Sequence, residues 1–387
     1  MIPLSVPYLK GNELKYVSQC IETEWVSTAG RFVTDFEKCI AEFAGSKHAI
    51  ACVNGTAALH LSLQMEGVQT DDEVLVPTLT FIAPVNAVCY LGAHPVFMDC
   101  DDHLNLDPEK LQDFLVKECF SKDGSVINKK TERIIKAVIV VHVFGHPARL
   151  DLLKEICSQF QLSLIEDATE SLGSYLITQD GTKIHTGTIG DFGCLSFNGN
   201  KLVTTGGGGM ILTSNQAKAL HAKHLTTQAK TDELYSIHDE VGYNYRLTNL
   251  QAAVGLAQME SIVSFLKIKR ANFEKYKKAL SSLSQISWIT EPVNTQSNHW
   301  FYALQTQKTE GVGSRDDLMH FLLKKDIQCR ALWRPNHLQK PYKHCQSYKI
   351  EKALHFSKTI LNIPCSLGIT EDEISTVSKG IKDYYGA

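Results

Sequence analysis

The sequence predicts an α/β protein that is built on a large, mainly parallel sheet. Short apolar runs such as 73–77 and 134–143 lack strict alternation with polar residues, which is typical of strands covered on both faces. Amphipathic helical patterns such as 149–160 separate these runs along the chain. In sheets of this kind ligands bind at the carboxyl ends of the strands, so the residues that follow each strand are the candidates for a functional site.

The expected elements alternate through the first half of the chain. We expect strands at 49–53, 73–77, 95–99, 134–143, 162–167 and 194–197, and helices that include 57–63, 84–88 and 149–160. The segment 118–133 is polar and is expected to be an exposed insertion between a helix and a strand.

The pattern changes beyond residue 258. A long helix is expected at 252–281, and its basic residues, which include Lys269, are expected to lie largely on exposed faces. Short strands and two further helices, at 314–324 and 370–384, follow it. These features predict a large domain at 1–257 and a small C-terminal α+β domain at 258–387.

The composition disfavours several classes of protein. A net charge of −3 argues against a surface that binds nucleic acid, and no apolar run is long enough to cross a membrane. The first residues have no signal-peptide pattern, so a cytoplasmic protein is expected. The eleven cysteines form no Cys-x-x-Cys pair. Those in apolar runs are expected to be buried thiols of a reducing compartment, and they include Cys52, Cys89, Cys157 and Cys194.

The histidines His142 and His146 have the spacing of a metal-binding helix. The two residues straddle a strand end and Gly145, however, where residues four apart do not share a helical face. No metal ion is therefore expected at this pair, or elsewhere in the chain.

Lys201 is the most informative residue, because four consecutive glycines follow it at 206–209. A lysine that forms a Schiff base with a flat cofactor needs open space and few bulky neighbours. An exposed lysine before a flexible loop has the same pattern, so this stretch alone does not separate the two interpretations. The other strand ends favour the first.

Further candidate residues follow other expected strands. Gly55 and Thr56 begin a helix, where backbone N–H groups bind anions such as phosphate, although an ordinary capped helix start looks the same. Asp167 ends a strand and can hold a protonated pyridine nitrogen, or it caps the next helix. Ser196 follows a third strand, and Phe81 can stack on a flat ring or pack in the core. Together with the lysine, these groups match the needs of pyridoxal 5'-phosphate (PLP).

With these residues, the chain resembles the DegT/DnrJ/StrS family of sugar aminotransferases. The resemblance extends from Pro3 to Ile374. It implies the fold type I of PLP-dependent transferases, which is aspartate-aminotransferase-like, and a homodimer with active sites at the subunit interface. The segments that carry it are Asn54-Gly55-Thr56-Ala57-Ala58-Leu59, Glu166-Asp167-Ala168, Ser196-Phe197 with Lys201 and its glycine run, and Gly242-Tyr243-Asn244-Tyr245-Arg246.

The resemblance implies a role for each matching residue. Lys201 corresponds to the catalytic lysine that binds PLP covalently, and Asp167 to the partner of the pyridine nitrogen. Many members carry Gln or His where this chain has Glu170, beside the phenolic oxygen of PLP, so one carboxyl of the site can require a proton. Arg246 is expected near the substrate. The remaining cofactor-binding residues are expected to be Gly55, Thr56, Ala57 and Ser196 at the phosphate, Phe81 on the ring, and Asn244 at the phosphate of the other subunit.

The resemblance also implies that an amino group moves from L-glutamate to a ketone on a nucleotide-linked sugar. Residues 198–200, the four-glycine run and the insertion before residue 134 resemble the legionaminic-acid pathway (LegC-like) subgroup. Such enzymes act at C4 of a nucleotide-linked 2-acetamido-4-keto-6-deoxyhexose. The products are amino sugars such as legionaminic acid or bacillosamine, which are used in polysaccharide biosynthesis.

The sequence is also compatible with other functions. An enzyme of the same family could act at C3 of a dTDP-linked keto sugar. A sugar 3-dehydrase that uses the aminated cofactor, PMP, typically carries His at the position of Lys201, so the lysine argues against it. A non-enzymatic regulatory relative could share the fold. A nucleotide-sugar dehydrogenase is disfavoured, because no Gly-x-Gly-x-x-Gly follows the first strand.

Overall fold

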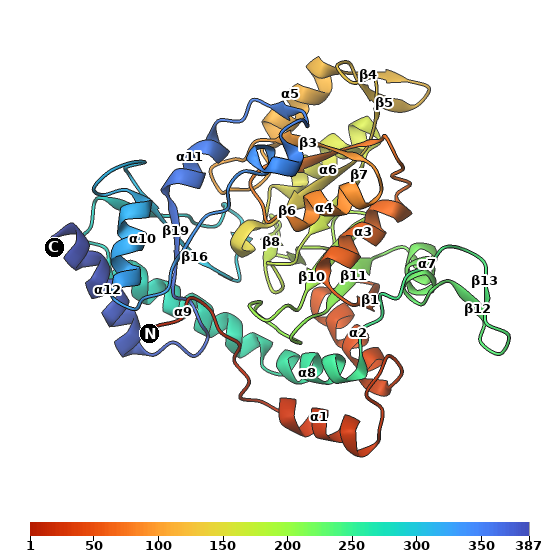
Figure 1. The fold of residues 1–387 in the computed structure, drawn as a ribbon, viewed down its shortest axis with the longest axis horizontal. Coiled ribbons are helices and arrows are strands. Elements are labelled where there is room, and N and C mark those ends of the chain that lie inside the picture. The colour runs from red at the N-terminus through yellow and green to blue at the C-terminus, as the bar shows by residue number, and fades with distance from the viewer. Residues whose placement is uncertain (387) are drawn as a thin grey trace.

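The computed structural model describes residues 1–386 and has the predicted α/β architecture, with a large sheet in the middle of the molecule (Figure 1). Its strands are β1 (His48–Cys52), β2 (Glu73–Pro77), β3 (His94–Met98), β4 (Cys119–Lys122), β5 (Ser125–Asn128), β6 (Ile134–Val141), β7 (Ser163–Asp167), β10 (Phe192–Ser196), β11 (Gly209–Thr213) and β18 (Ser347–Tyr348). The main order is β1-β11-β10-β7-β6-β2-β3-β18. Strands from β10 to β18 run parallel, while β11 pairs antiparallel with both β1 and β10. The sheet is therefore mainly parallel, as predicted.

Helices cover both faces of this sheet because its strands are apolar on both sides. In β6, Ile139 packs with residues of α3 and α4, whereas Val138 and Val140 pack with residues of α5 and α6. The helices of this part of the chain are α1 (Glu13–Glu22), α2 (Arg31–Ala44), α3 (Gly55–Met65), α4 (Ala83–Tyr90), α5 (Pro108–Glu118), α6 (Leu150–Phe160), α7 (Gln216–Thr226) and α8 (Asn249–Met259).

A second, smaller sheet lies in the C-terminal part of the chain, in the order β14-β16-β19-β17. Its strands are β14 (Ile286–Trp288), β16 (Tyr302–Thr306), β17 (Arg330–Ala331) and β19 (Ile360–Ile363), and the helices of this part are α9 (Ile262–Ala279), α10 (Arg315–Lys324), α11 (Lys352–Thr359) and α12 (Glu371–Tyr385). Ser314 and Thr370 cap α10 and α12, which explains why both helices begin where the sequence predicts. The boundary between domains at residue 257 stays a proposal, because β18 from the C-terminal part joins the large sheet.

Two minor sheets complete the fold. One contains β8 (Tyr175–Ile177), β9 (Lys183–His185) and β15 (Thr295–Gln296), and the other is the hairpin of β12 (Lys230–Asp232) and β13 (Ile237–His238). Figure 1 shows this hairpin projecting from the molecule beyond α7, on the side away from α10 and α12. Among the described residues, none of the helices has the length and apolar composition that a membrane span needs.

The predicted long helix at 252–281 is wrong, because the chain forms α8 and α9 with a break between them. Ser261, at this break, has a φ of −107° and a ψ of 0°, outside the helical values, and its side chain makes no capping hydrogen bond. The prediction of exposure also fails at Lys269, which is buried and donates hydrogen bonds to the carbonyl groups of Trp300 and Cys365.

Two further predictions need correction. The segment 118–133 is not simply an exposed insertion, because β4 and β5 form a hairpin and β5 extends the large sheet beside β6. Val126 and Asn128 of this hairpin are buried, although most of its other residues are polar. Cys89 is exposed rather than buried, since it lies on the outer side of α4, whereas Cys52, Cys157 and Cys194 are buried.

Candidate active site

A cavity of about 350 Å³ lies where β7 and β10 end and α3 begins. It brings together most of the residues that the sequence singled out. Those that line it are Gly55, Thr56, Phe81, Asp167, Glu170, Ser196 and Lys201. They follow separate strands of one sheet, where ligands bind in sheets of this kind.

The N-terminus of α3 forms one wall of the cavity. The side chain of Asn54 caps this helix by accepting a 2.8 Å hydrogen bond from the Ala57 N–H. The N–H groups of Gly55 and Thr56 belong to the same first turn, have no partner within a helix, and line the cavity. A Cβ on Gly55 would lie 2.9 Å from Thr169 Cγ2 and 3.0 Å from Ser196 Cβ, so a larger residue would force these side chains to shift. The wall is suited to an anion such as a phosphate.

The glycine run lies beside this wall, and its surroundings and backbone conformation require glycine at several of its positions. An added Cβ on Gly209 would lie 2.4 Å from the backbone carbon of Asn54, which leaves no room for a side chain. Gly206 and Gly208 have φ values of 78° and 134°, which other residues rarely adopt. The run therefore lets the loop after Lys201 pass close to the helix start.

Asp167 ends β7 and is buried, with 3% of its surface exposed. Its Oδ1 accepts a 3.1 Å hydrogen bond from the Thr169 N–H. Burial raises the pKa of Asp167, and the hydrogen bonds from Thr169 and the charge of Lys201 act in the opposite direction. A buried carboxyl that lines the cavity can bind a cationic N–H of a ligand.

Lys201 extends into the cavity from the loop after β10. Its Nζ lies 3.7 Å from Glu170 Oε1 and 4.0 Å from the centre of the Trp300 indole. Burial lowers the pKa of Lys201, while the charges of Glu170 and Asp167 raise it. A lowered pKa increases the fraction of neutral amine, which is the form that reacts as a nucleophile or base.

Three predicted residues do not line the cavity of their own chain. The Ala57 N–H is already used by Asn54, so Ala57 supports the helix start rather than a ligand. Asn244 is exposed and Arg246 lies apart from the cavity, with its Nε buried and without a partner in residues 1–386. Their predicted roles would require a second subunit and stay predictions.

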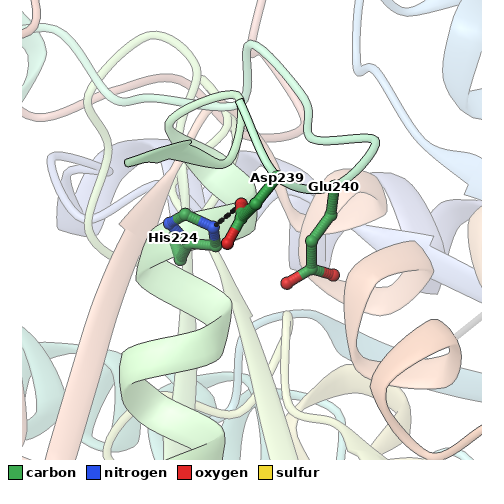
Figure 2. A group of neighbouring side chains, drawn as sticks. All are labelled: His224, Asp239 and Glu240. Atoms are coloured by element: carbon green, nitrogen blue, oxygen red, sulfur yellow. Dashed lines mark hydrogen bonds and ion pairs between the residues drawn. The ribbon is translucent and has the colours of Figure 1, made fainter. Parts of the chain in front are cut away.

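The segment that leads to Asn244 is fastened to α7. His224 Nε2 lies 2.6 Å from Asp239 Oδ1, and Figure 2 shows both side chains pointing toward each other with Glu240 beside them. These three residues offer possible metal ligands within 4.8 Å of one another, but His224 pairs with Asp239 and Glu240 pairs with His221, which accounts for their arrangement. His142, from the other histidine pair, is buried and contacts Glu166 Oε2 at 3.1 Å.

The C-terminal part contributes a wall that the sequence reasoning missed. Its residues at the cavity are Trp300, Phe301, Arg330, Ala331, Trp333 and Asn362. The buried amide oxygens of Asn200 and Asn362 line the cavity, and neither has a hydrogen-bond donor within residues 1–386. Only the fold brings these residues to the lysine, and their local sequence carries no recognisable motif.

The residues present fit PLP. The N-terminus of α3 suits its phosphate, Asp167 its ring nitrogen, Phe81 a ring face and Lys201 its aldehyde carbon. The cavity volume is within the range of small-molecule sites. The amide oxygens of Asn200 and Asn362 have no hydrogen-bond donor within residues 1–386. When bound, PLP supplies a sink for the electrons of a broken bond at the amino-acid Cα.

Comparisons with known proteins identify relatives that match nearly the whole chain. The model of the DegT/DnrJ/EryC1/StrS aminotransferase family matches residues 7–382. GDP-perosamine synthase of Caulobacter vibrioides is 37% identical over 97% of this chain and 96% of its own length, and that of Vibrio cholerae is 36% identical over 100% and 99%. A crystal structure of a family aminotransferase from Brucella abortus has a TM-score of 0.87 and 26% identity, covering 97% of this chain and 96% of that one.

We predict that Lys201 is the lysine that binds PLP covalently. Borohydride reduction of the PLP-loaded protein, followed by peptide mapping, should place the label on Lys201. Lys269 is a matched control, because it is also buried but does not line the cavity, and its amine donates to the backbone carbonyls of Trp300 and Cys365. Labelling at Lys269 or at another lysine, with Lys201 unmodified, would disprove the assignment.

Proposed function

We propose that this chain, which belongs to the DegT/DnrJ/EryC1/StrS family of PLP-dependent sugar aminotransferases, moves an amino group from L-glutamate to the C4 ketone of a nucleotide-linked keto sugar. The observation that carries the proposal is the meeting of Lys201, Asp167 and the N-terminus of α3 in one cavity. The intact lysine supports an aminotransferase over a sugar 3-dehydrase.

Each group of cavity residues has a separate role in the proposed reaction. The first turn of α3 binds the phosphate and fixes the position of the cofactor. The amine of Lys201 moves the Cα proton of the amino-acid donor, as base and then as acid. Asp167 keeps a proton on the ring nitrogen, so that the ring can accept electrons. The unpaired guanidinium of Arg330 at the cavity wall suits a carboxylate of L-glutamate or a substrate phosphate.

The sugar and its nucleotide are the finer part of the proposal. The names of the two bacterial relatives state a GDP-linked product, which makes GDP the first nucleotide to test. The resemblance to the legionaminic-acid subgroup favours a 2-acetamido-4-keto-6-deoxyhexose instead. Both alternatives place the amine on an amino sugar for polysaccharide biosynthesis, and a cytoplasmic location fits such substrates.

A panel of substrates tests the proposal. GDP-, UDP- and dTDP-linked 4-keto-6-deoxy sugars, with and without a 2-acetamido group, are supplied with L-glutamate, and 2-oxoglutarate and the aminated sugar are measured. We expect one nucleotide series to react, with the new amine at C4 by NMR. The Lys201→Ala variant is the negative control, in which no aminated sugar is expected. An amine at C3, or no reaction in any series, would contradict the proposal.

We predict that Asp167→Asn keeps the fold and loses activity by about a thousandfold or more. Asparagine can still accept the Thr169 N–H, but it has no charge to hold the pyridinium proton. The loss corresponds to ~4 kcal/mol of transition-state stabilisation. Steady-state rates with glutamate measure it, and Asp151→Asn on the exposed side of α6 is the control. Activity within about tenfold of the parent would show that Asp167 only holds the turn at Thr169.

We also propose a homodimer in which Asn244 and Arg246 serve the site of the neighbouring subunit. Asn244 supports this, since it is exposed and does not line the cavity of its own chain. The projecting β12–β13 hairpin carries exposed apolar residues beside it, including Leu234, Tyr235 and Ile237. An exposed apolar cluster of this kind is typical of an interface.

Mixing two inactive variants tests the shared site. Subunits with Lys201→Ala and Asn244→Ala should regain activity after exchange, because each mixed dimer has one site with both residues intact. With equivalent sites in a C2 dimer, recovery should approach about a quarter of the parent sites. Lys201→Ala mixed with Asp167→Asn is the matched control and should regain nothing, since both residues line one chain's cavity. Exchange confirmed by mass spectrometry without recovery would refute sharing through Asn244.

A further inference from the structure

An ion pair between Glu170 and Lys201 lies inside the cavity. Glu170 Oε1 is 3.7 Å from Lys201 Nζ, and the two side chains are only 4% and 12% exposed. The other carboxylate oxygen of Glu170 accepts a 2.9 Å hydrogen bond from the Phe144 N–H. This bond holds one oxygen at the backbone and leaves the second facing the amine.

Burial acts on the two groups in opposite directions. It raises the pKa of Glu170 to about 7, and it lowers the pKa of Lys201. Burial therefore brings the charged pair and the neutral pair closer in free energy, and two groups at this distance titrate as a pair.

We propose that Glu170 is the proton partner of Lys201, so that the two buried side chains hold one proton between them whenever the amine is free. The proton passes from the ammonium nitrogen to Glu170 Oε1, leaving a neutral amine and a neutral carboxylic acid, and it returns by the same route. A small movement of the lysine side chain brings the two atoms within hydrogen-bonding distance.

This pairing gives Lys201 both forms that its reaction needs. With Glu170 protonated, the neutral amine accepts a proton from the donor Cα and later gives that proton up as the acid of the same reaction, so that the pair again holds one proton. When the pair is ionised instead, the Glu170 carboxylate balances the buried ammonium, which would be too costly alone. Glu170 acts through Lys201 and not on the substrate, so it is a positioning residue. The inference rests on the proposed function only for the role of Lys201.

The other charged groups around the pair do not replace Glu170. Asp167 also favours the ammonium form of Lys201, but its carboxylate is the proposed partner of the cofactor ring. Arg330 lines the same cavity, but its positive charge cannot stabilise an ammonium group. His142 is buried in the core and acts on Asp167. Among residues 1–386, Glu170 is the carboxylate within 4.0 Å of the lysine amine.

The test uses the full chain without PLP, and therefore needs neither cofactor nor sugar. Acetic anhydride labels neutral amines only, and the labelling of Lys201 is quantified by mass spectrometry over a range of pH. In Glu170→Gln the midpoint should fall by about 1–3 pH units, because an opposite charge at this distance shifts a pKa by that amount. Glutamine can still accept the Phe144 N–H, so the turn is kept.

Two further variants keep the test decisive. Glu170→Asp retains the charge at a greater distance and should give an intermediate midpoint, which also serves if the glutamine variant fails to fold. Glu155→Gln makes the same chemical change on the exposed side of α6 and should leave the midpoint unchanged. A midpoint in the Glu170 variants equal to that of the parent would overturn the proposal. A shifted midpoint with no reaction in the sugar panel would instead overturn the proposed function.

Discussion

The burial of Asp167, Glu170 and Lys201 in one cavity is the constraint on which the rest of the structure depends. Charged groups lose their hydration when they are buried, and this is tolerated only beside opposite charges and hydrogen-bond donors. The chain supplies these from separate places: the end of β7, the loop after β10 and the turn at Phe144, whose φ is 56°. The large sheet has to keep these three segments in fixed positions relative to one another.

Close backbone approach is the second requirement. The loop after Lys201 passes so near to Asn54 that Gly209 has no room for a side chain, and Gly55 is packed against Thr169. The phosphate wall and the lysine loop are thus one packed unit. This explains why the glycine residues are as much a part of the site as the groups that carry charge.

The sequence predicts the large sheet and the lysine, acid and helix start, because these follow directly from apolar runs and from residues at strand ends. It fails where distant segments meet. Trp300, Arg330 and Asn362 reach the cavity from the C-terminal part, and no local pattern marks them. The burial of Lys269 is also missed, since it depends on the carbonyl groups of Trp300 and Cys365, which are distant in the sequence.

The place of β18 has a consequence for the synthesis of the protein. This short strand, Ser347–Tyr348, closes the edge of β3, although it is made long after β3. Until then the emerging chain has an unpaired strand edge, which is a template for contacts with other chains. Residues 99–346 must therefore be made before this edge of the central sheet can be covered, and chaperones that cover strand edges would act during that interval.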